Sequence, residues 1–233
     1  FVLGAAGNIK HEKLVELANN AFKDSPARSP RDFNFTKPEF HPNKFQKLND
    51  SLQQAYVIIG FNSHSAVSPL RHRFSIMSDI LGGGMSSRLF QAIREERGLA
   101  YTVSTFSDSY LDCGIHLIYS VVDKTNVEQY LQAVKDEIEL LKKDGITQDE
   151  LDRSRDHMKA SVILGMENSL TRMRYHVSNE INLKKDLPIE AIVEDVNGAT
   201  VDDINQLIRS ELDMRKETVF LYGDVPGQAR PAQ

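Results

Sequence analysis

The sequence predicts an α+β fold, a two-layer α/β sandwich in which helices on one face cover a largely antiparallel sheet. Two strand patterns, 100–109 and 112–122, are separated by a short turn, which is typical of an antiparallel hairpin. Helical patterns then follow one another almost to the end of the chain. Of the 233 residues, 40% are hydrophobic, which is enough apolar mass for a sizeable core.

The N-terminal half begins with a strand pattern over 1–7, FVLGAAG, followed by an amphipathic helix through residue 24. Because a domain rarely begins inside a strand, we expect the chain to be the C-terminal piece of a longer protein. Residues 25–42 contain four prolines and no periodicity, which predicts a linker. A central strand is predicted over 52–61, and a helix that starts at Pro69 and stops before Gly82.

The next segment, 82–101, reads GGGMSSRLFQAIREERGLAY and predicts a helix from about Ser86 to Arg97. In strand 112–122, alternate residues form an apolar face, with His116 opposite it. A long helix over 124–143 ends at Gly145, and Thr147 and Glu150 have the spacing of a capping box for another. The remaining helices are predicted over 170–183, 188–196 and 201–212, and a last strand over 217–225.

Composition excludes several classes of function. The net charge of −5 gives no basic footprint, so nucleic acid is not an expected partner. No run approaches the roughly 20 apolar residues of a membrane helix, so no membrane partner is expected. Cys113 is the single cysteine, which excludes a disulfide within the chain. No signal peptide opens the sequence, and any targeting segment would lie upstream.

The glycine run does not fit a phosphate-binding loop. A P-loop requires a Gly-Lys pair, and the chain contains none. A dinucleotide fingerprint requires a third glycine where Ser87 stands, and it follows a strand, whereas a helix is predicted before Gly82. Glycine has no Cβ, so the run would instead let the backbone approach a facing domain or a peptide.

The residues also give no complete active site of their own. The seven histidines are scattered, and neither H-E-x-x-H nor H-x-x-E-H occurs, so no zinc-hydrolase helix is present. We expect His116 to be a half-exposed strand residue and Cys113 to be a buried, inert thiol. No G-x-S-x-G nucleophile elbow occurs either.

The segment LGGGMSSRLFQAIREERGLAY resembles the second domain of the pitrilysin/insulinase-type zinc metallopeptidases, the group that includes mitochondrial processing peptidase. Its flanks, QQAYVIIGF and SDSYLDCGIHLIYS, resemble the strands on either side. The stretch 144–173 resembles the helix pair that follows, and 1–22 resembles the strand and helix that end the first domain. The resemblance covers nearly the whole chain and implies the LuxS/processing-peptidase-like metallohydrolase fold.

The resemblance implies a division of the chain and a cofactor. Residues 1–25 would end the preceding zinc domain, 26–45 would be the linker, and 46–233 would form the C-terminal, non-zinc peptidase domain. The zinc ligands and the general base of the family lie outside these residues, so this chain alone should bind no metal and be inactive. The expected partners are a peptide substrate and the N-terminal zinc domain or an active partner subunit, in a homo- or heterodimer.

The resemblance places the family's catalytic arginine and tyrosine at Arg94 and Tyr101. Arg94 could donate charge-assisted hydrogen bonds to a peptide carbonyl or an acidic side chain. Tyr101 could donate its hydroxyl to the oxyanion that develops on the scissile carbonyl. The alternative for Arg94 is a surface salt bridge with Glu95 or Glu96. For Tyr101 the alternative is an ordinary residue at a strand edge.

Three further residues are candidates for substrate binding: Gly83, Gly84 and Arg88. Arg88 would contact substrate or the partner domain, and its alternative is an exposed side chain in the first turn of the helix. The implied function is the substrate-positioning domain of a zinc-dependent endopeptidase. A non-catalytic subunit of a two-subunit peptidase, or a structural relative such as the respiratory-complex core proteins, is the alternative.

Overall fold

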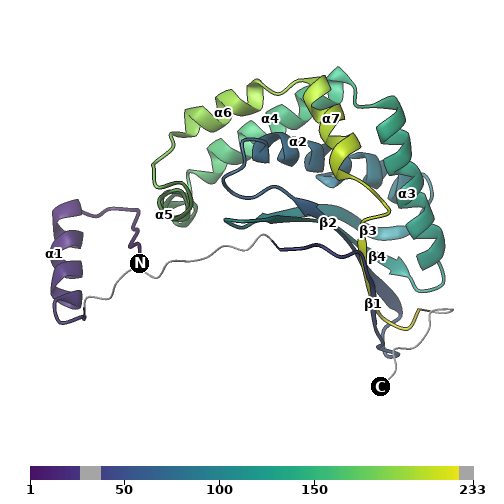
Figure 1. The fold of residues 1–233 in the computed structure, drawn as a ribbon, viewed down its shortest axis with the longest axis horizontal. Coiled ribbons are helices and arrows are strands. Elements are labelled where there is room, and N and C mark those ends of the chain that lie inside the picture. Colours follow the sequence, from purple (N-terminus) through teal and green to yellow (C-terminus); the bar gives the residue numbers. More distant parts are fainter. Residues whose placement is uncertain (27–37, 226–233) are drawn as a thin grey trace.

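The computed structural model describes residues 1–26 and 38–225, and it confirms the two-layer α/β sandwich. One layer is a five-stranded sheet in the order β1-β5-β2-β4-β3. Its strands are β1 (Lys44–Lys47), β2 (Gln54–Ser63), β3 (Ala100–Ser109), β4 (Gly114–Asp123) and β5 (Thr218–Tyr222). Only the β1–β5 pair is parallel, so the sheet is largely antiparallel as predicted. The helices lie above this sheet in Figure 1.

The helical layer forms from the patterns predicted in the sequence. Its members are α2 (Arg71–Gly82), the short π-helix η1 (Phe90–Glu95), α3 (Val127–Asp144), α4 (Gln148–Gly165), α5 (Ser169–Leu183), α6 (Ile189–Asn197) and α7 (Val201–Glu211). Helix α2 packs on β3, and α7 contacts β2. The core lies between the two layers, and residues such as Ile59, Ile118 and Leu81 in it are fully buried.

Local capping signals fix the helix ends. The predicted capping box is confirmed at the start of α4, where the Thr147 hydroxyl accepts from the Glu150 amide and the Glu150 carboxylate accepts from the Thr147 amide. A second capping box, between Thr200 and Asp203, begins α7. Gly145 follows α3 with a φ of 74°, a left-handed conformation that favours glycine.

The structure reverses the two faces of β4. The alternation is as predicted, but the helices cover Gly114, His116, Ile118, Ser120 and Val122, while Ile115, Leu117, Tyr119 and Val121 face away from them and are half-buried. His116 is therefore fully buried, and the prediction of a half-exposed strand residue is wrong. The physical reason is that polar groups on the covered face find partners in the core, as the Ser120 hydroxyl does with the Tyr130 hydroxyl.

One prediction near the N-terminus also needs correction. Residues 1–7 form no strand, since no described strand runs beside them to supply cross-strand hydrogen bonds. Gly4 instead lies against Val177 and Met173 of α5. Most of the predicted linker 26–45 lies outside the described residues, and its last two residues already belong to β1.

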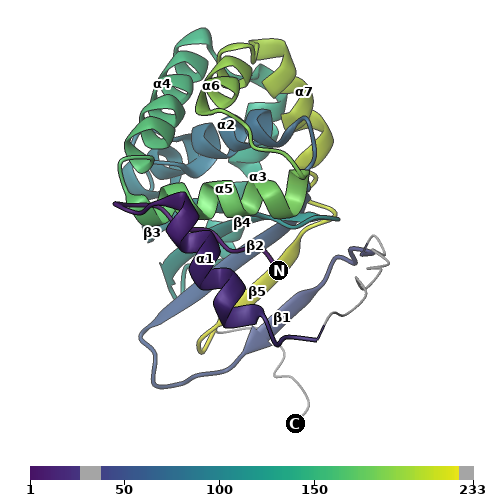
Figure 2. The same cartoon turned by 90° about the vertical axis from the view of Figure 1, so that its left-hand side faces the viewer.

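The helix α1 (His11–Phe22) forms as predicted and stands apart from the sandwich in Figure 1. In Figure 2, which is viewed from that side, it lies in front of the sandwich. None of its residues is buried. Within the described part of the chain, no helix has the length and apolar character that a membrane span requires.

Candidate functional site

The segment between α2 and β3 is a short, irregular helix. The prediction of a regular helix over 86–97 is wrong in type and length, because residues Phe90–Glu95 form a π-helix. The Glu96 amide donates to the Gln91 carbonyl five residues back, at 2.9 Å. π-Helical turns are rare and are concentrated at functional sites.

Gly98 turns this segment into β3. Its φ is 60°, and the Leu99 amide donates to the Ile93 carbonyl at 2.9 Å. This bond spans six positions around a left-handed glycine, one more than the 6→1 bond of a Schellman motif, because the turn that it closes is π-helical. Because Gly98 reverses the chain so tightly, β3 begins at Ala100, directly beside the helix it follows.

Tyr101 occupies a β-bulge at the start of β3. Ala100 pairs with Val122 and Thr102 with Val121, so Tyr101 has no partner in the register. A bulge inserts one residue, bends the strand and re-aims a side chain. The Tyr101 side chain is 72% exposed although the residues on either side are buried or half-buried.

The structure brings Arg94 and Tyr101 into contact. The Arg94 guanidinium lies over the Tyr101 ring at 5.6 Å from its centroid, and over the Phe90 ring at 4.8 Å. Both distances are within the range of cation–π attraction. The predicted alternative, an ion pair with Glu95, is present only as a long contact of 3.7 Å. Arg94 is therefore held by two aromatic rings while its side chain stays 41% exposed.

Arg88 has a different environment. Its guanidinium bonds both carboxylate oxygens of Glu150, with the Nη2 to Oε2 distance at 2.9 Å, and it also reaches the Gly145 carbonyl at 3.4 Å. Burial acts to raise the pKa of Glu150, but the bonds from Arg88 and Thr147 hold that pKa below its ordinary value. This geometry favours a structural role, tying η1 to the cap of α4, and the substrate-binding role of Arg88 stays a prediction.

Replacing Arg88 by alanine should destabilise the domain by about 2 kcal/mol, because Glu150 would be left largely buried without its cation. The Arg88 and Glu150 side chains are only 25% and 11% exposed. Urea unfolding of the purified chain measures the change in the free energy of unfolding. The control is Lys13→Ala on α1, because Lys13 and its partner Glu16 are both exposed, and this change should alter the free energy of unfolding little. Arg155→Ala is less suitable as a control, because it breaks the pair with Asp152 and also removes bonds to two carbonyls.

The glycine run packs against its own domain rather than standing free. A Cβ on Gly82 would lie 2.5 Å from the Thr105 side chain, and one on Gly83 would lie 2.6 Å from the Asp79 Cα. Only at Gly84 is the space open. The close approach that these glycines permit is thus within the chain at Gly82 and Gly83.

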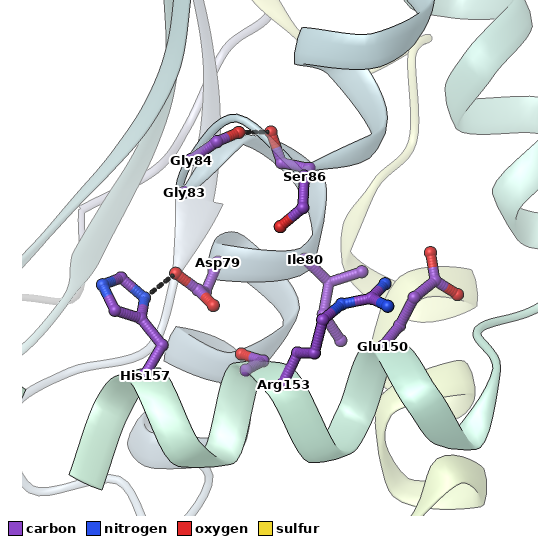
Figure 3. A pocket seen from close by; sticks show the side chains of 10 residues that line it. Asp79, Ile80, Gly83, Gly84, Ser86, Glu150, Arg153 and His157 are labelled. Atoms are coloured by element: carbon purple, nitrogen blue, oxygen red, sulfur yellow. Dashed lines mark hydrogen bonds and ion pairs between the residues drawn. The ribbon is translucent and has the colours of Figure 1, made fainter. Parts of the chain in front are cut away.

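Gly83 and Gly84 line a pocket of about 200 Å³ between the end of α2 and α4 (Figure 3). There the His157 Nδ1 lies 2.8 Å from the Asp79 Oδ1, and the Arg153 side chain points away from this pair toward Glu150. Neither Arg94 nor Tyr101 lines this pocket. The structure therefore separates the two candidate glycines from the Arg94–Tyr101 pair, and their role in substrate binding stays a prediction.

The described residues do not fit a zinc site. Among 1–26 and 38–225, no three His, Cys, Asp or Glu side chains gather as metal ligands. His116 contacts Ser107 through Nδ1, at 2.9 Å, and is otherwise enclosed by aromatic rings. Cys113 is half-buried rather than buried, and burial together with Asp112 raises the pKa of its thiol. The thiol is therefore protonated at neutral pH, and its inertness stays a prediction.

Sequence reasoning missed Phe90 as part of the site. Its ring and the Tyr101 ring both contact the Arg94 guanidinium, and it packs against the core. The available signal was its spacing, since residues four apart on a helix share a face. Asp79 and His157 lie 78 positions apart in the sequence, so no local signal could have paired them.

Comparison with known proteins identifies the family of the chain. The family described as peptidase M16 inactive domain matches residues 1–158. The chain belongs to the M16, or pitrilysin, peptidase family. It is 31% identical over 208 residues to YmxG, an uncharacterized zinc protease of Bacillus subtilis. The predicted resemblance to the C-terminal domain of these peptidases is confirmed.

The chain matches only part of the length of its relatives. The match covers 89% of this chain and 50% of YmxG, so the chain spans about half the length of that relative. A protease from Helicobacter pylori has the same fold, with a TM-score of 0.80 at 18% identity over 94% of this chain and 53% of its own. A chain of complex III from Candida albicans also has it, with a TM-score of 0.78 at 19% identity over 93% and 53%.

Proposed function

We propose that this chain is the substrate-positioning domain of a zinc-dependent endopeptidase. The observation that carries the proposal is the Arg94–Tyr101 pair, in which a guanidinium held between two rings lies over an exposed tyrosine on a β-bulge. A purely structural domain has no need of an exposed arginine and tyrosine stacked in this way. The proposal includes zinc and protease activity because relatives such as YmxG are named as zinc proteases.

The chemistry of the pair suits a peptide bond under attack. The Tyr101 hydroxyl can donate a hydrogen bond to the oxygen of the scissile carbonyl, and this bond strengthens as negative charge develops there. Arg94 can donate to a second peptide carbonyl or to a carboxylate, which fixes the register of the chain. No three metal-ligating side chains gather among the described residues, so the proposal assigns the zinc to the facing domain or partner subunit.

The proposal includes a facing zinc domain or partner subunit. The helix α1 supports it, because Val15, Leu17 and Phe22 are 42%, 53% and 46% exposed on a helix with an apolar side. An amphipathic helix gains most of its stability from packing that side against other elements. We therefore propose that residues 1–25 complete a preceding zinc domain, that 26–45 link the two, and that the second domain starts near residue 46.

A non-catalytic role in the same family is the second candidate. The family model that matches residues 1–158 is described as an inactive domain, which favours this candidate. An H-x-x-E-H motif with a later glutamate on the same polypeptide would assign an active chain. Their occurrence on a separate subunit would make this chain the helper of a two-subunit peptidase.

The test of the proposal is the change Arg94→Ala in the complete peptidase, that is, with the zinc-bearing partner present. Loss of a charge-assisted hydrogen bond should lower kcat/KM by roughly 10- to 100-fold. Steady-state hydrolysis of a fluorogenic peptide measures it.

Arg97→Ala is the matched control, because Arg97 is an exposed arginine three residues further along that contacts only the Ala133 carbonyl, at 3.4 Å. Equal kcat/KM values for wild type and Arg94→Ala would remove the pair from substrate binding.

A further inference from the structure

One face of the sheet carries apolar side chains that no described helix covers. Helices α2, α3, α4, α6 and α7 all lie on the opposite side, as Figure 1 shows. The uncovered face consists of alternate residues of each strand, as the register establishes. Its centre is apolar and uncharged, with the members Tyr56, Ile58, Leu117, Tyr119, Val121, Phe220 and Tyr222, each half-buried.

Aromatic rings on this face touch one another across the strands. The Tyr56 ring lies 6.0 Å from that of Tyr222 and 6.4 Å from that of Tyr119, between ring centroids. The Tyr119 ring lies 6.3 Å from that of Phe106, which is 55% exposed. We call these four residues, Phe106, Tyr119, Tyr56 and Tyr222, the aromatic strip. It crosses β3, β4, β2 and β5 in the order in which they pair.

The strip is continuous with the Arg94–Tyr101 pair. Lys47 pairs with Tyr222, Tyr222 with Tyr56, and Tyr56 with Val121. Val121 in turn pairs with Thr102, the residue after the Tyr101 bulge. One cross-strand row therefore leads from Thr102, the neighbour of Tyr101, to Tyr56 and Tyr222, two members of the strip.

A cation stands at each end of this row. Arg94 lies over Tyr101 at one end, and the Lys47 Nζ lies 5.6 Å from the Tyr222 ring centroid at the other. The centre between them has no charged side chain, and large exposed apolar patches of this kind mark binding surfaces. The complementary ligand is an extended peptide with bulky apolar side chains in the middle and a carboxylate at one end.

We propose that the aromatic strip binds the apolar side chains of the peptide whose scissile bond lies at Tyr101. The inference rests on the proposed function and adds a substrate class to it. Three strand spacings, from β3 to β5, amount to roughly 14 Å, and an extended peptide rises roughly 3.3 Å per residue. The strip therefore recognises bulky apolar residues at alternating positions within about four residues of Tyr101, and Lys47 meets an acidic residue about two residues further on.

The absence of tryptophan from the chain allows a direct binding test. A seven-residue peptide with one tryptophan, leucines at alternating positions and a terminal aspartate is titrated with the purified chain, and its emission reports binding without background from the protein. A matched peptide has serine in place of each leucine. We expect the leucine peptide to bind about tenfold more tightly or better, from the apolar area it buries.

The variant Tyr119→Thr/Tyr222→Thr should abolish this preference, and threonine keeps the strand propensity of the sites. Tyr110→Thr is the control, because Tyr110 is 54% exposed in the turn between β3 and β4, outside the strip. Phe106→Ser, at a side chain exposed to solvent, gives a second variant if the double one unfolds, as a urea melt would reveal. Lys47→Gln should weaken binding of the leucine peptide, but not binding of the same peptide with an amidated asparagine in place of its terminal aspartate.

Equal affinity for the two peptides, or a preference that survives in both strip variants, would overturn the proposal. A dimer that disappears in the strip variants, detected by sedimentation, would also overturn it, because a second copy would then occupy the face. The proposed function is tested separately by Arg94→Ala and Tyr101→Phe in the complete peptidase. If these leave hydrolysis unchanged while the strip keeps its preference, the proposed function fails and the peptide-binding face stands.

Discussion

Tyr101→Phe is expected to slow peptide hydrolysis by the complete peptidase by roughly one to three orders of magnitude, the cost of removing one oxyanion hydrogen-bond donor. The change removes a single hydroxyl. The ring that contacts the Arg94 guanidinium is retained, so Arg94 keeps both aromatic neighbours. The loss should appear in kcat rather than in KM, since the developing negative charge exists only in the transition state.

Steady-state kinetics with one fluorogenic peptide, over a full range of concentrations, separates kcat from KM for this variant. Tyr110→Phe is the matched control, since it removes a hydroxyl from another exposed tyrosine of the same chain. Circular dichroism of both variants should match that of the wild type, because Tyr101 is 72% exposed and contributes little to the core. A kcat equal to that of the wild type would exclude Tyr101 from transition-state stabilisation.

Features with local signals could be predicted from the sequence. Strand β3 has the predicted bounds, 100–109, because a run rich in β-branched and aromatic residues between two turn signals indicates a strand by itself. The capping box at Thr147 and Glu150 is also local, as both partners lie within one helical turn. Gly98 was recognisable as a helix stop because few residues other than glycine adopt its left-handed conformation readily.

Features that depend on distant contacts could not be predicted. The partner of Arg88 is Glu150, 62 positions away, so no local pattern could decide between a substrate contact and a structural ion pair. The π-helical turn at Arg94 and the bulge at Tyr101 bring the pair together, and neither has a recognisable residue signature. The seven-residue spacing of the pair indicated closeness, but the cation–π stack with Phe90 required coordinates.

The faces of β4 show why alternation alone is not enough. Both faces of this central strand carry apolar residues, so its pattern cannot decide which one the helices cover. The apolar face seen in the sequence, with Ile115, Leu117 and Tyr119, is the uncovered face that carries part of the aromatic strip. The covered face includes His116, which makes a polar strand residue part of the core.

Buried His116 should make the domain unstable in mild acid. Its side chain is fully buried among Phe61, Phe74 and Ser107, and burial lowers the pKa of His116 to about 4. In the unfolded chain the pKa has its ordinary value of 6.5, so the unfolded state binds a proton first as the pH falls. The free energy of unfolding therefore has its full value above pH 6.5, and about 3 kcal/mol of it is lost by pH 4.

Urea unfolding at intervals between pH 7.5 and pH 4.5 measures this loss in a window where most carboxylates are still ionised. His116→Leu removes the titration, and the partner hydroxyl of Ser107 lies on an exposed residue that water can reach, so the variant should lose much less stability with falling pH. Burial also lowers the pKa of His72, despite its bond to Asp195, and this second histidine accounts for a residual slope. His157→Gln, at a side chain that is 59% exposed, should keep the slope of the wild type. A His116→Leu variant with an undiminished slope would show that another group controls acid unfolding, because no other change is made at this site.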